Sequence, residues 1–165
     1  MKKILVALGV MLAVVASLVL WGSKFATNMV HDQLVAQKIS FPDEATLKED
    51  NAALVKYAGQ AVDSGDKAKA YSDYIGGHLK SVAGGKTYSE VSAAYQKDRT
   101  NQTLAGQRTT LFQGETLRGL LLNAWGWGLV GAIAMYAALA IYVAAAGLVV
   151  AAVVLPTTGK KRAKK

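Results

Sequence analysis

The first segment that could do chemistry is Ala83-Gly84-Gly85-Lys86-Thr87, which looks like the end of a phosphate-binding loop. A complete loop needs a glycine, four further residues and then Gly-Lys-Ser/Thr, so that backbone amides and the lysine surround the phosphate oxygens. In this chain Lys80 stands where the first glycine is needed. A glycine that ends one helix and a threonine that begins the next explain the whole segment. We therefore predict a connection between two helices here and no nucleotide site.

Histidines and paired carboxylates are the other candidates. His31 stands beside Asp32, and His78 lies in an apolar stripe, but neither has a second ligand at metal-binding spacing on its own helix. The adjacent acids Asp43-Glu44 and Glu49-Asp50 suit the first turn of a helix, where the dipole stabilises negative charge. The chain has no cysteine and no Gly-x-Ser-x-Gly elbow. The sequence therefore predicts no catalytic residue, no metal and no cofactor.

Two apolar runs near the ends of the chain determine how the rest must be arranged. Ile4–Gly22 follows Met1-Lys2-Lys3, and Leu120–Leu155 precedes a tail with five basic residues. About 20 apolar residues cross a bilayer as a helix, and Lys and Arg favour its cytoplasmic side. We therefore predict cytoplasmic residues 1–3, a transmembrane helix at 4–22, an extracytoplasmic domain at 23–119 and a basic cytoplasmic tail at 156–165.

The first run also has the composition of a signal peptide, with Val15-Ala16-Ser17 as a small-residue cleavage site. Leu18-Val19-Leu20-Trp21 continue the hydrophobicity past that site. Trp21 suits a membrane interface, where aromatic side chains gather. These residues favour a retained transmembrane helix over a cleaved signal.

The second run has 36 residues and would be about 54 Å long as a helix, more than one straight crossing of a ~30 Å hydrocarbon core. Two crossings would place the basic tail outside, against the charge rule. We therefore predict one transmembrane helix at 131–155 after an interfacial lead-in at 120–130. Trp125 and Trp127 in this lead-in, like Trp21, are predicted at a membrane interface.

The segment between the runs reads as helix interrupted by glycine and one proline. The first helix should continue over 24–38 and end at Ser40-Phe41-Pro42-Asp43, because proline disfavours helix in the residue before it. A second helix is expected from about Asp50, and Asp63-Ser64-Gly65-Asp66 should form a turn. The predicted fold class is all-α, with two transmembrane helices flanking a small extracytoplasmic helical bundle.

One amphipathic stripe stands out within that bundle. Its members recur at three- and four-residue spacing, which predicts a helix with one buried side: Tyr71, Tyr74, Ile75, His78, Leu79 and Val82. Gly84-Gly85 should end this helix. Thr87 and Glu90 then match a capping box at the start of the next one, and a further segment is expected at about 103–118.

Small residues recur in both apolar runs, where they allow helices to approach closely in lipid. The predicted helix-contact residues are Gly9, Ala13 and Ser17 in the first run and Ala140, Ala144, Gly147 and Ala151 in the second. They predict contact between the two helices or with a partner, with Gly9 near Gly147 if the helices run antiparallel. Neither span contains a Lys, Arg, Asp, Glu or His, which argues against a pump or an ion pore.

The net charge of +8 comes almost entirely from the two ends of the chain. Lys2, Lys3 and the five basic residues of the tail contribute +7 of it, so the basic surplus reflects topology, with a second role at anionic inner-leaflet lipids. Nucleic acid is therefore excluded as a partner. The lipid bilayer is the expected one, together with a membrane-protein partner or a second copy of the chain.

Three stretches carry a resemblance to a known family: HDQLVAQKISFPD, KYAGQAVDSGDKAKAYSDYIGGHLKSVAGGKTYSEVS and LFQGETLRGLLLNAWGWG. In this order they resemble an uncharacterised family of small integral membrane proteins from actinobacteria. The resemblance implies a bacterial plasma membrane and brings no catalytic residue. Small membrane proteins of such organisms are sometimes accessory subunits of large respiratory assemblies.

Two functions from different classes follow from these observations. The first is a non-enzymatic two-pass plasma-membrane protein, an accessory or scaffolding subunit that docks on other membrane proteins. The alternative is an extracytoplasmic ligand-binding or sensing module anchored by two helices. Its ligand would lie between the tyrosine-bearing helices, near Tyr71, Tyr74, Tyr88 and Tyr95.

Overall fold

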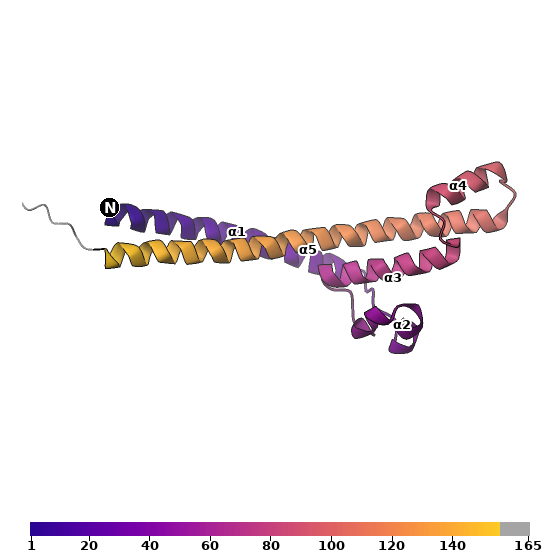
Figure 1. Cartoon of the computed structure of the whole chain (residues 1–165), viewed down its shortest axis with the longest axis horizontal. Helices are drawn as coiled ribbons and strands as arrows, with labels where there is room; N and C mark the ends of the chain where they lie inside the picture. The colour runs from indigo at the N-terminus through magenta and orange to yellow at the C-terminus, as the bar shows by residue number, and fades with distance from the viewer. Residues whose placement is uncertain (156–165) are drawn as a thin grey trace, which may run out of the picture. The chain divides into compact units, whose positions relative to one another are not determined.

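The computed structural model describes residues 1–155, and these residues are mainly helical (Figure 1). In chain order the elements are α1 (Lys2–Ala36), α2 (Glu44–Asp50), the 3-10 helix η1 (Ala52–Tyr57), α3 (Gly65–Ala83), α4 (Tyr88–Lys97) and α5 (Gln102–Val154). Within residues 1–155 the only strand-like pairing is an isolated bridge between Ser40 and Ala61. The all-α prediction is confirmed, whereas the predicted basic tail at 156–165 lies outside the described residues.

The chain divides into two compact units. The two-helix unit joins Met1–Phe25 to the chain from Gly131 onward, and the central unit is Ala26–Val130. Helices α1 and α5 each contribute one part to the two-helix unit and another part to the central unit.

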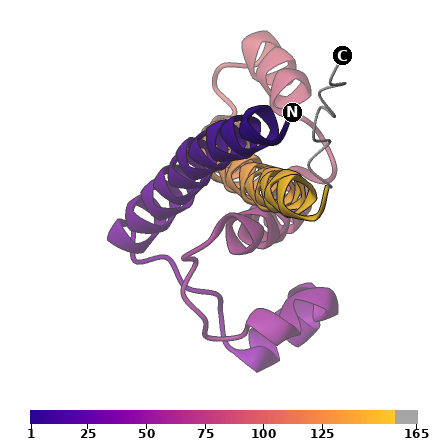
Figure 2. The same cartoon turned by 90° about the vertical axis from the view of Figure 1, so that its left-hand side faces the viewer.

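In the two-helix unit, α1 and α5 lie side by side and antiparallel (Figure 2). Lys2 near the start of α1 contacts Val153 near the end of α5, and Ser23 further along α1 contacts Gly131 further back on α5, as expected for antiparallel helices. By length and composition, α1 and α5 are the two helices of residues 1–155 that could cross a membrane. Most of their apolar surface is uncovered. Only 11% of the most apolar 18-residue stretch of α1 is buried, and only 17% of that of α5.

The larger core of the central unit gathers side chains from α1, α2, α3, η1 and α5. Phe41, Leu47 and Val62 are nearly inaccessible within it, and Val30 and Leu121 join from the long helices. Phe41 follows the end of α1, and its ring stacks on Tyr57 with centroids 5.1 Å apart. The loop that Pro42 was predicted to produce therefore inserts an aromatic ring into the core.

The second helix differs from its prediction at both ends. Asp43 caps the start of α2 by accepting a hydrogen bond from the Thr46 amide at 2.9 Å. Helix α2 then ends at Asp50, which is where the second helix was expected to begin. Asn51 is extended and starts η1 by accepting from the Ala53 amide at 3.2 Å. The acids Asp43-Glu44 begin a helix as expected, but Glu49-Asp50 end it. The apolar residues between positions 54 and 62 are spaced as in an α-helix, which is why the sequence predicts one there. The structure has only the short 3-10 helix η1 in this segment, and such helices are common as connectors.

The connection between α3 and α4 confirms the interpretation of the glycine and threonine pair. Gly84 is left-handed, with φ of 58°, and the Gly85 amide donates to the Lys80 carbonyl at 2.8 Å. Thr87 and Glu90 form both bonds of the capping box. Gly84 therefore ends α3 and Thr87 begins α4, as the glycine and threonine pair predicts.

The capping box gives a pH prediction. The Thr87 backbone amide and then its hydroxyl stabilise the Glu90 carboxylate, which lowers the pKa of Glu90 below its ordinary value of 4.5. A lowered folded-state pKa stabilises α4 above pH 4.5, and this contribution is lost as the pH falls through the folded-state pKa. We expect hydrogen-exchange protection of the α4 amides to decline over that acid range.

The comparison with Glu90→Gln isolates this effect, because Gln can keep the capping box and does not titrate. Its protection factors should depend less steeply on pH than those of the native chain. Asp98 also has a lowered pKa, through Thr100, and remains in both proteins. Equal pH profiles for the two proteins would show that Glu90 contributes nothing to α4.

The buried face of α3 is rotated from the predicted stripe. Leu79 is 5% exposed, but Val82 is 44% exposed, and His78 lies at the surface. The deepest positions are instead Ala68, Ser72, Leu79 and Ala83. Large apolar side chains defined the predicted stripe, whereas small residues allow α3 to approach α5 most closely.

Helix α5 runs without interruption for 53 residues. The segments predicted separately at 103–118, 120–130 and 131–155 are all parts of this one helix. No proline occurs between Gln102 and Val154, and the glycines within this range do not break it. Glycine costs only about 1 kcal/mol in a helix interior, which packing on one side can offset.

Candidate functional site

The contact between α1 and α5 in the two-helix unit is a seam of small residues that recur every seven positions. The α1 side consists of Gly9, Ala16 and Ser23, and the α5 side of Gly131, Ala138, Ala145 and Ala152, all of them buried. A seven-residue spacing keeps one face of a helix toward its partner when the helices supercoil. Because every position on this face is small, the two backbones can approach closely.

Gly9 lies at the closest approach. A Cβ atom on Gly9 would be 2.9 Å from Val149 Cγ2 and 3.0 Å from the Ala145 carbonyl oxygen. Both distances are shorter than normal van der Waals contact, and one of the two atoms belongs to the backbone. Position 9 therefore requires glycine for this spacing between the helices.

Polar contacts fix the alignment of the seam. Ser23 Oγ donates to the Gly131 carbonyl at 2.7 Å from a buried position. Ser17 Oγ donates to the carbonyl of Ala13 at 2.8 Å and lies 2.7 Å from Tyr142 Oη. Since a serine hydroxyl has one proton, Tyr142 is the donor to Ser17.

The structure places the predicted contact residues differently on the two helices. Gly9 and Ala13 face α5 and line a shallow apolar groove of about 410 Å³, and Ser17 contacts Tyr142. On α5, Ala140, Ala144 and Gly147 are exposed, and Ala151 is half-buried. The predicted pairing of Gly9 with Gly147 is wrong, because a Cβ on Gly147 would meet nothing within 4 Å.

The sequence predicted only Gly9 of the seam and not its six other buried residues, Ala16, Ser23, Gly131, Ala138, Ala145 and Ala152. The predicted residues of α5 lie in pairs four positions apart, whereas Gly131, Ala138, Ala145 and Ala152 recur every seven residues. The same spacing links Gly9, Ala16 and Ser23 on α1. Matching these two sequence periods would have identified the seam.

A second small-residue face remains uncovered on α5. Ala140 and Gly147 each lie two positions beyond a seam residue, about 200° around the helix. With Ala144 they form an exposed face on the side of α5 away from α1. Helix α5 therefore has two faces suited to close helix contact, of which α1 occupies one.

The three tryptophans have different surroundings. Trp21 is 69% exposed and stacks on Phe25, with centroids 5.8 Å apart. Trp127 is also well exposed, as an interfacial residue would be. Trp125 instead packs within the central unit, where a Cβ on Gly65 would be 3.3 Å from the Trp125 Cα. Lys69 Nζ lies 5.8 Å from the centroid of the Trp125 ring.

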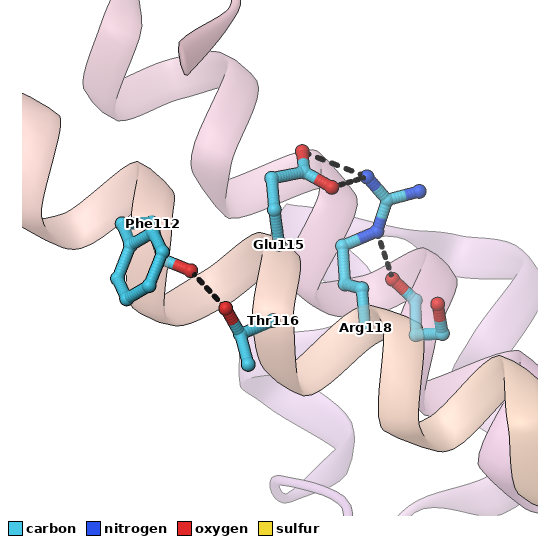
Figure 3. A network of polar contacts seen from close by, with 5 residues as sticks. Phe112, Glu115, Thr116 and Arg118 are labelled. Atoms are coloured by element: carbon cyan, nitrogen blue, oxygen red, sulfur yellow. Dashed lines mark hydrogen bonds and ion pairs between the residues drawn. The ribbon is translucent and has the colours of Figure 1, made fainter.

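In the central unit, Arg118 of α5 is held against α3 (Figure 3). Its Nε donates to the Ser72 carbonyl at 3.1 Å, and its Nη1 donates to both Glu115 carboxylate oxygens at 3.0 and 2.8 Å. The guanidinium carbon lies 3.1 Å from where a Cβ on Gly76 would be. Gly76 therefore gives the guanidinium the space to lie flat on α3.

Arg118 borders an open groove of about 770 Å³ between α3, the start of α4 and α5. Leu79, Leu111 and Tyr88 supply apolar lining, and Leu79 and Leu111 are buried. The charged residues of the lining are Asp73, Lys80, Lys86, Glu115 and Arg118. Asp73 is paired with Lys69 at 2.8 Å, and Glu115 with Arg118.

The four tyrosines expected around a ligand lie in two separate groups. Tyr71 and Tyr74 pack with Phe41 against the larger core, and burial raises the pKa of both hydroxyls, with Asp50 adding to the effect at Tyr74. Tyr88 packs on Phe112, and Tyr95 lies under Arg108. They therefore do not line one common pocket.

The histidines are hydrogen-bonded near the surface. His78 Nε2 lies 2.8 Å from Tyr74 Oη and 3.4 Å from Asp50 Oδ2. His31 Nδ1 lies 2.9 Å from the Asp63 carbonyl. His78 was predicted to be packed, but it is half exposed because it belongs to the outer side of α3. Within residues 1–155, no three His, Asp or Glu side chains gather as a metal site would require.

Comparison with known proteins identifies no relative of this chain: no family model, curated protein or solved structure matches it.

Proposed function

We propose that the chain is a non-enzymatic two-pass protein of a bacterial plasma membrane that docks on another membrane protein. In this proposal α1 and α5 cross the bilayer, both termini are cytoplasmic and the central unit is extracytoplasmic. The chain acts as an accessory or scaffolding subunit. Since small membrane proteins of actinobacteria are sometimes accessory subunits of large respiratory assemblies, such an assembly is one class of partner.

One observation carries the docking proposal. The seam with α1 occupies only the Gly131, Ala138, Ala145 and Ala152 face of α5. The exposed face with Ala144 and Gly147 remains without a partner helix among the described residues. Helix association in lipid depends on close packing, which small side chains permit. This face is therefore suited to a transmembrane helix of the partner.

Charge placement supports the orientation. Residues 4–22 and 131–155 contain no Lys, Arg, Asp, Glu or His, and Lys2 and Lys3 precede the first of these segments. Lys2 Nζ lies 3.4 Å from the Val153 carbonyl, so the start of α1 and the end of α5 lie at the same end of the pair. Both helices thus have a lysine at one boundary, which the positive-inside rule assigns to the cytoplasm.

The test is capture of partners from native membranes after crosslinking, followed by mass spectrometry. We expect Ala144→Leu/Gly147→Leu to lose the specific partners, because two leucines prevent close helix approach. The matched control, Ala7→Leu/Gly22→Leu, adds equal bulk to α1, and a Cβ on Gly22 meets nothing within 4 Å. Equal capture by both variants would contradict docking through this face.

Topology is checked in the same strains. Reporter fusions at Met1 and Lys165 should report cytoplasm, and a fusion at Gly65 should report the outside. A cytoplasmic Gly65 would overturn the orientation. Release of the chain from membranes by alkaline carbonate would overturn membrane insertion itself.

A further inference from the structure

We propose that the groove between α3, α4 and α5 binds a small soluble organic anion, an apolar body that carries a phosphate or carboxylate group. This site lies in the central unit and is independent of the docking face on α5. Its lining combines buried apolar side chains, two lysines that have no ion pair within residues 1–155, and glycines that leave room for a ligand.

The charge of the groove favours an anion. Both acids in its lining are already paired, Asp73 with Lys69 and Glu115 with Arg118. Lys80 and Lys86 have no ion pair within residues 1–155. The acid nearest in sequence to Lys86, Glu90, is bonded to Thr87 in the capping box. Two ammonium groups therefore border the groove without an ion pair, although the Glu90 carboxylate is close enough to interact electrostatically with Lys86.

Arg118 adds a positioned donor. Ser72 and Glu115 hold the guanidinium through Nε and Nη1, and its side chain is only 28% exposed. Nη2 has no hydrogen-bond acceptor among the described residues (Figure 3). A guanidinium that is already oriented loses less conformational freedom when it binds a carboxylate or phosphate.

The lining also selects for an apolar body. Leu79 and Leu111 are buried, and Tyr88 is half-buried beside them. Gly77 and Gly85 border the groove, and a Cβ on either would meet nothing within 4 Å. The space of about 770 Å³ falls within the roughly 300–1,000 Å³ typical of sites for small organic ligands. It therefore exceeds what an inorganic ion alone would fill.

The test is calorimetric titration of the full chain in nanodiscs of zwitterionic lipid, with phenyl phosphate as the probe. We expect a dissociation constant of about 1 mM or tighter. Inorganic phosphate should bind more weakly because it lacks the apolar body, and benzyl alcohol more weakly because it lacks the charge. No heat of binding from phenyl phosphate up to about 20 mM would overturn the proposal.

Two variants separate charge from shape. Lys80→Gln/Lys86→Gln should weaken binding about ten-fold, whereas Lys48→Gln/Lys97→Gln removes the same charge elsewhere and should leave binding unchanged. Gly77→Phe should block the groove, whereas Gly106→Phe, on an open face of α5, should not. Equal weakening by both lysine pairs would show only a general effect of net charge and would overturn the site.

A last arm distinguishes a soluble ligand from a lipid headgroup. Nanodiscs that contain phosphatidic acid present the same phosphate chemistry from the membrane surface. If the soluble probe binds with the same affinity in their presence, the groove accepts a soluble anion as proposed. If phosphatidic acid displaces the probe from the native chain, the ligand is a lipid headgroup and the proposal is wrong.

Discussion

Replacement of Gly9 by leucine should separate α1 from α5 in the two-helix unit. Even a single Cβ at this position would lie 2.9 Å from Val149 Cγ2 and 3.0 Å from the Ala145 carbonyl oxygen. The carbonyl cannot rotate away without disturbing the α5 backbone, so the helices must move apart. Overpacking of this kind costs about 1–3 kcal/mol. Insertion into the membrane should persist, because leucine is more lipophilic than glycine.

The measurement is crosslinking of Ser17→Cys to Tyr142→Cys with a short bismaleimide, which spans the gap left when cysteine replaces the longer tyrosine, whose hydroxyl lies 2.7 Å from Ser17 Oγ. The chain has no other cysteine, so the background is clean. We expect Gly9→Leu to reduce the rate of crosslinking, whereas Gly147→Leu leaves it unchanged. The two variants add the same side chain, but only position 9 lies in the seam. An unchanged rate in Gly9→Leu would contradict the close approach at this position.

Leu79→Ala should strongly destabilise the central unit. Leu79 is 5% exposed and belongs to a cluster with Ala83, Val91 and Leu111. Truncation of a buried leucine to alanine costs about 2–5 kcal/mol, depending on how far the surroundings collapse. Collapse should be limited here, because Arg118 and its partners hold α3 and α5 at a fixed distance.

Gly114 on α5 supplies an internal control for this prediction. A Cβ on Gly114 would be 2.5 Å from Leu79 Cδ2, so Gly114→Ala alone crowds the leucine. In Leu79→Ala/Gly114→Ala the new methyl group occupies space that the leucine vacated. We expect this pair to be more stable than Leu79→Ala, as hydrogen exchange of the α3 amides would show. Val82→Ala, at an exposed position, should lose less than about 0.5 kcal/mol.

The sequence predicted those features of the fold that depend on local chemistry. Helix α1 ended at Ala36, before the left-handed Lys38 and ahead of the break predicted at residues 40–43. Gly84 and Gly85 ended α3, and Thr87 with Glu90 began α4. Each of these signals acts within a few residues, so its outcome does not depend on packing elsewhere. The two long apolar helices were predicted for the same reason, since composition alone defines them.

The faces that meet in space were harder to predict. Large side chains dominate the periodicity of α3, yet Ser72 is completely buried and Val82 is exposed. In the two-helix unit, Ala144 and Ala145 are identical in type, but only Ala145 faces α1. Residue type cannot distinguish two such neighbours. The position of Gly9 on the opposite helix decides between them, and that information is tertiary.

The run of alanines in α5 has a consequence for rotation of that helix about its own axis. A turn of about 100°, one residue, would replace Ala138, Ala145 and Ala152 in the seam by Ala137, Ala144 and Ala151. Since all six are alanine, side-chain volume barely distinguishes the two orientations of α5 at these three positions. Helix α1 lacks this freedom, because the same turn would bring Leu8 and Val15 into the seam. At the far end of the α5 seam the turn would replace Gly131 by Val130, and the hydroxyls of Ser17 and Ser23 would lose their partners. One glycine and two hydrogen bonds therefore select one orientation of α5, and the alanines do not.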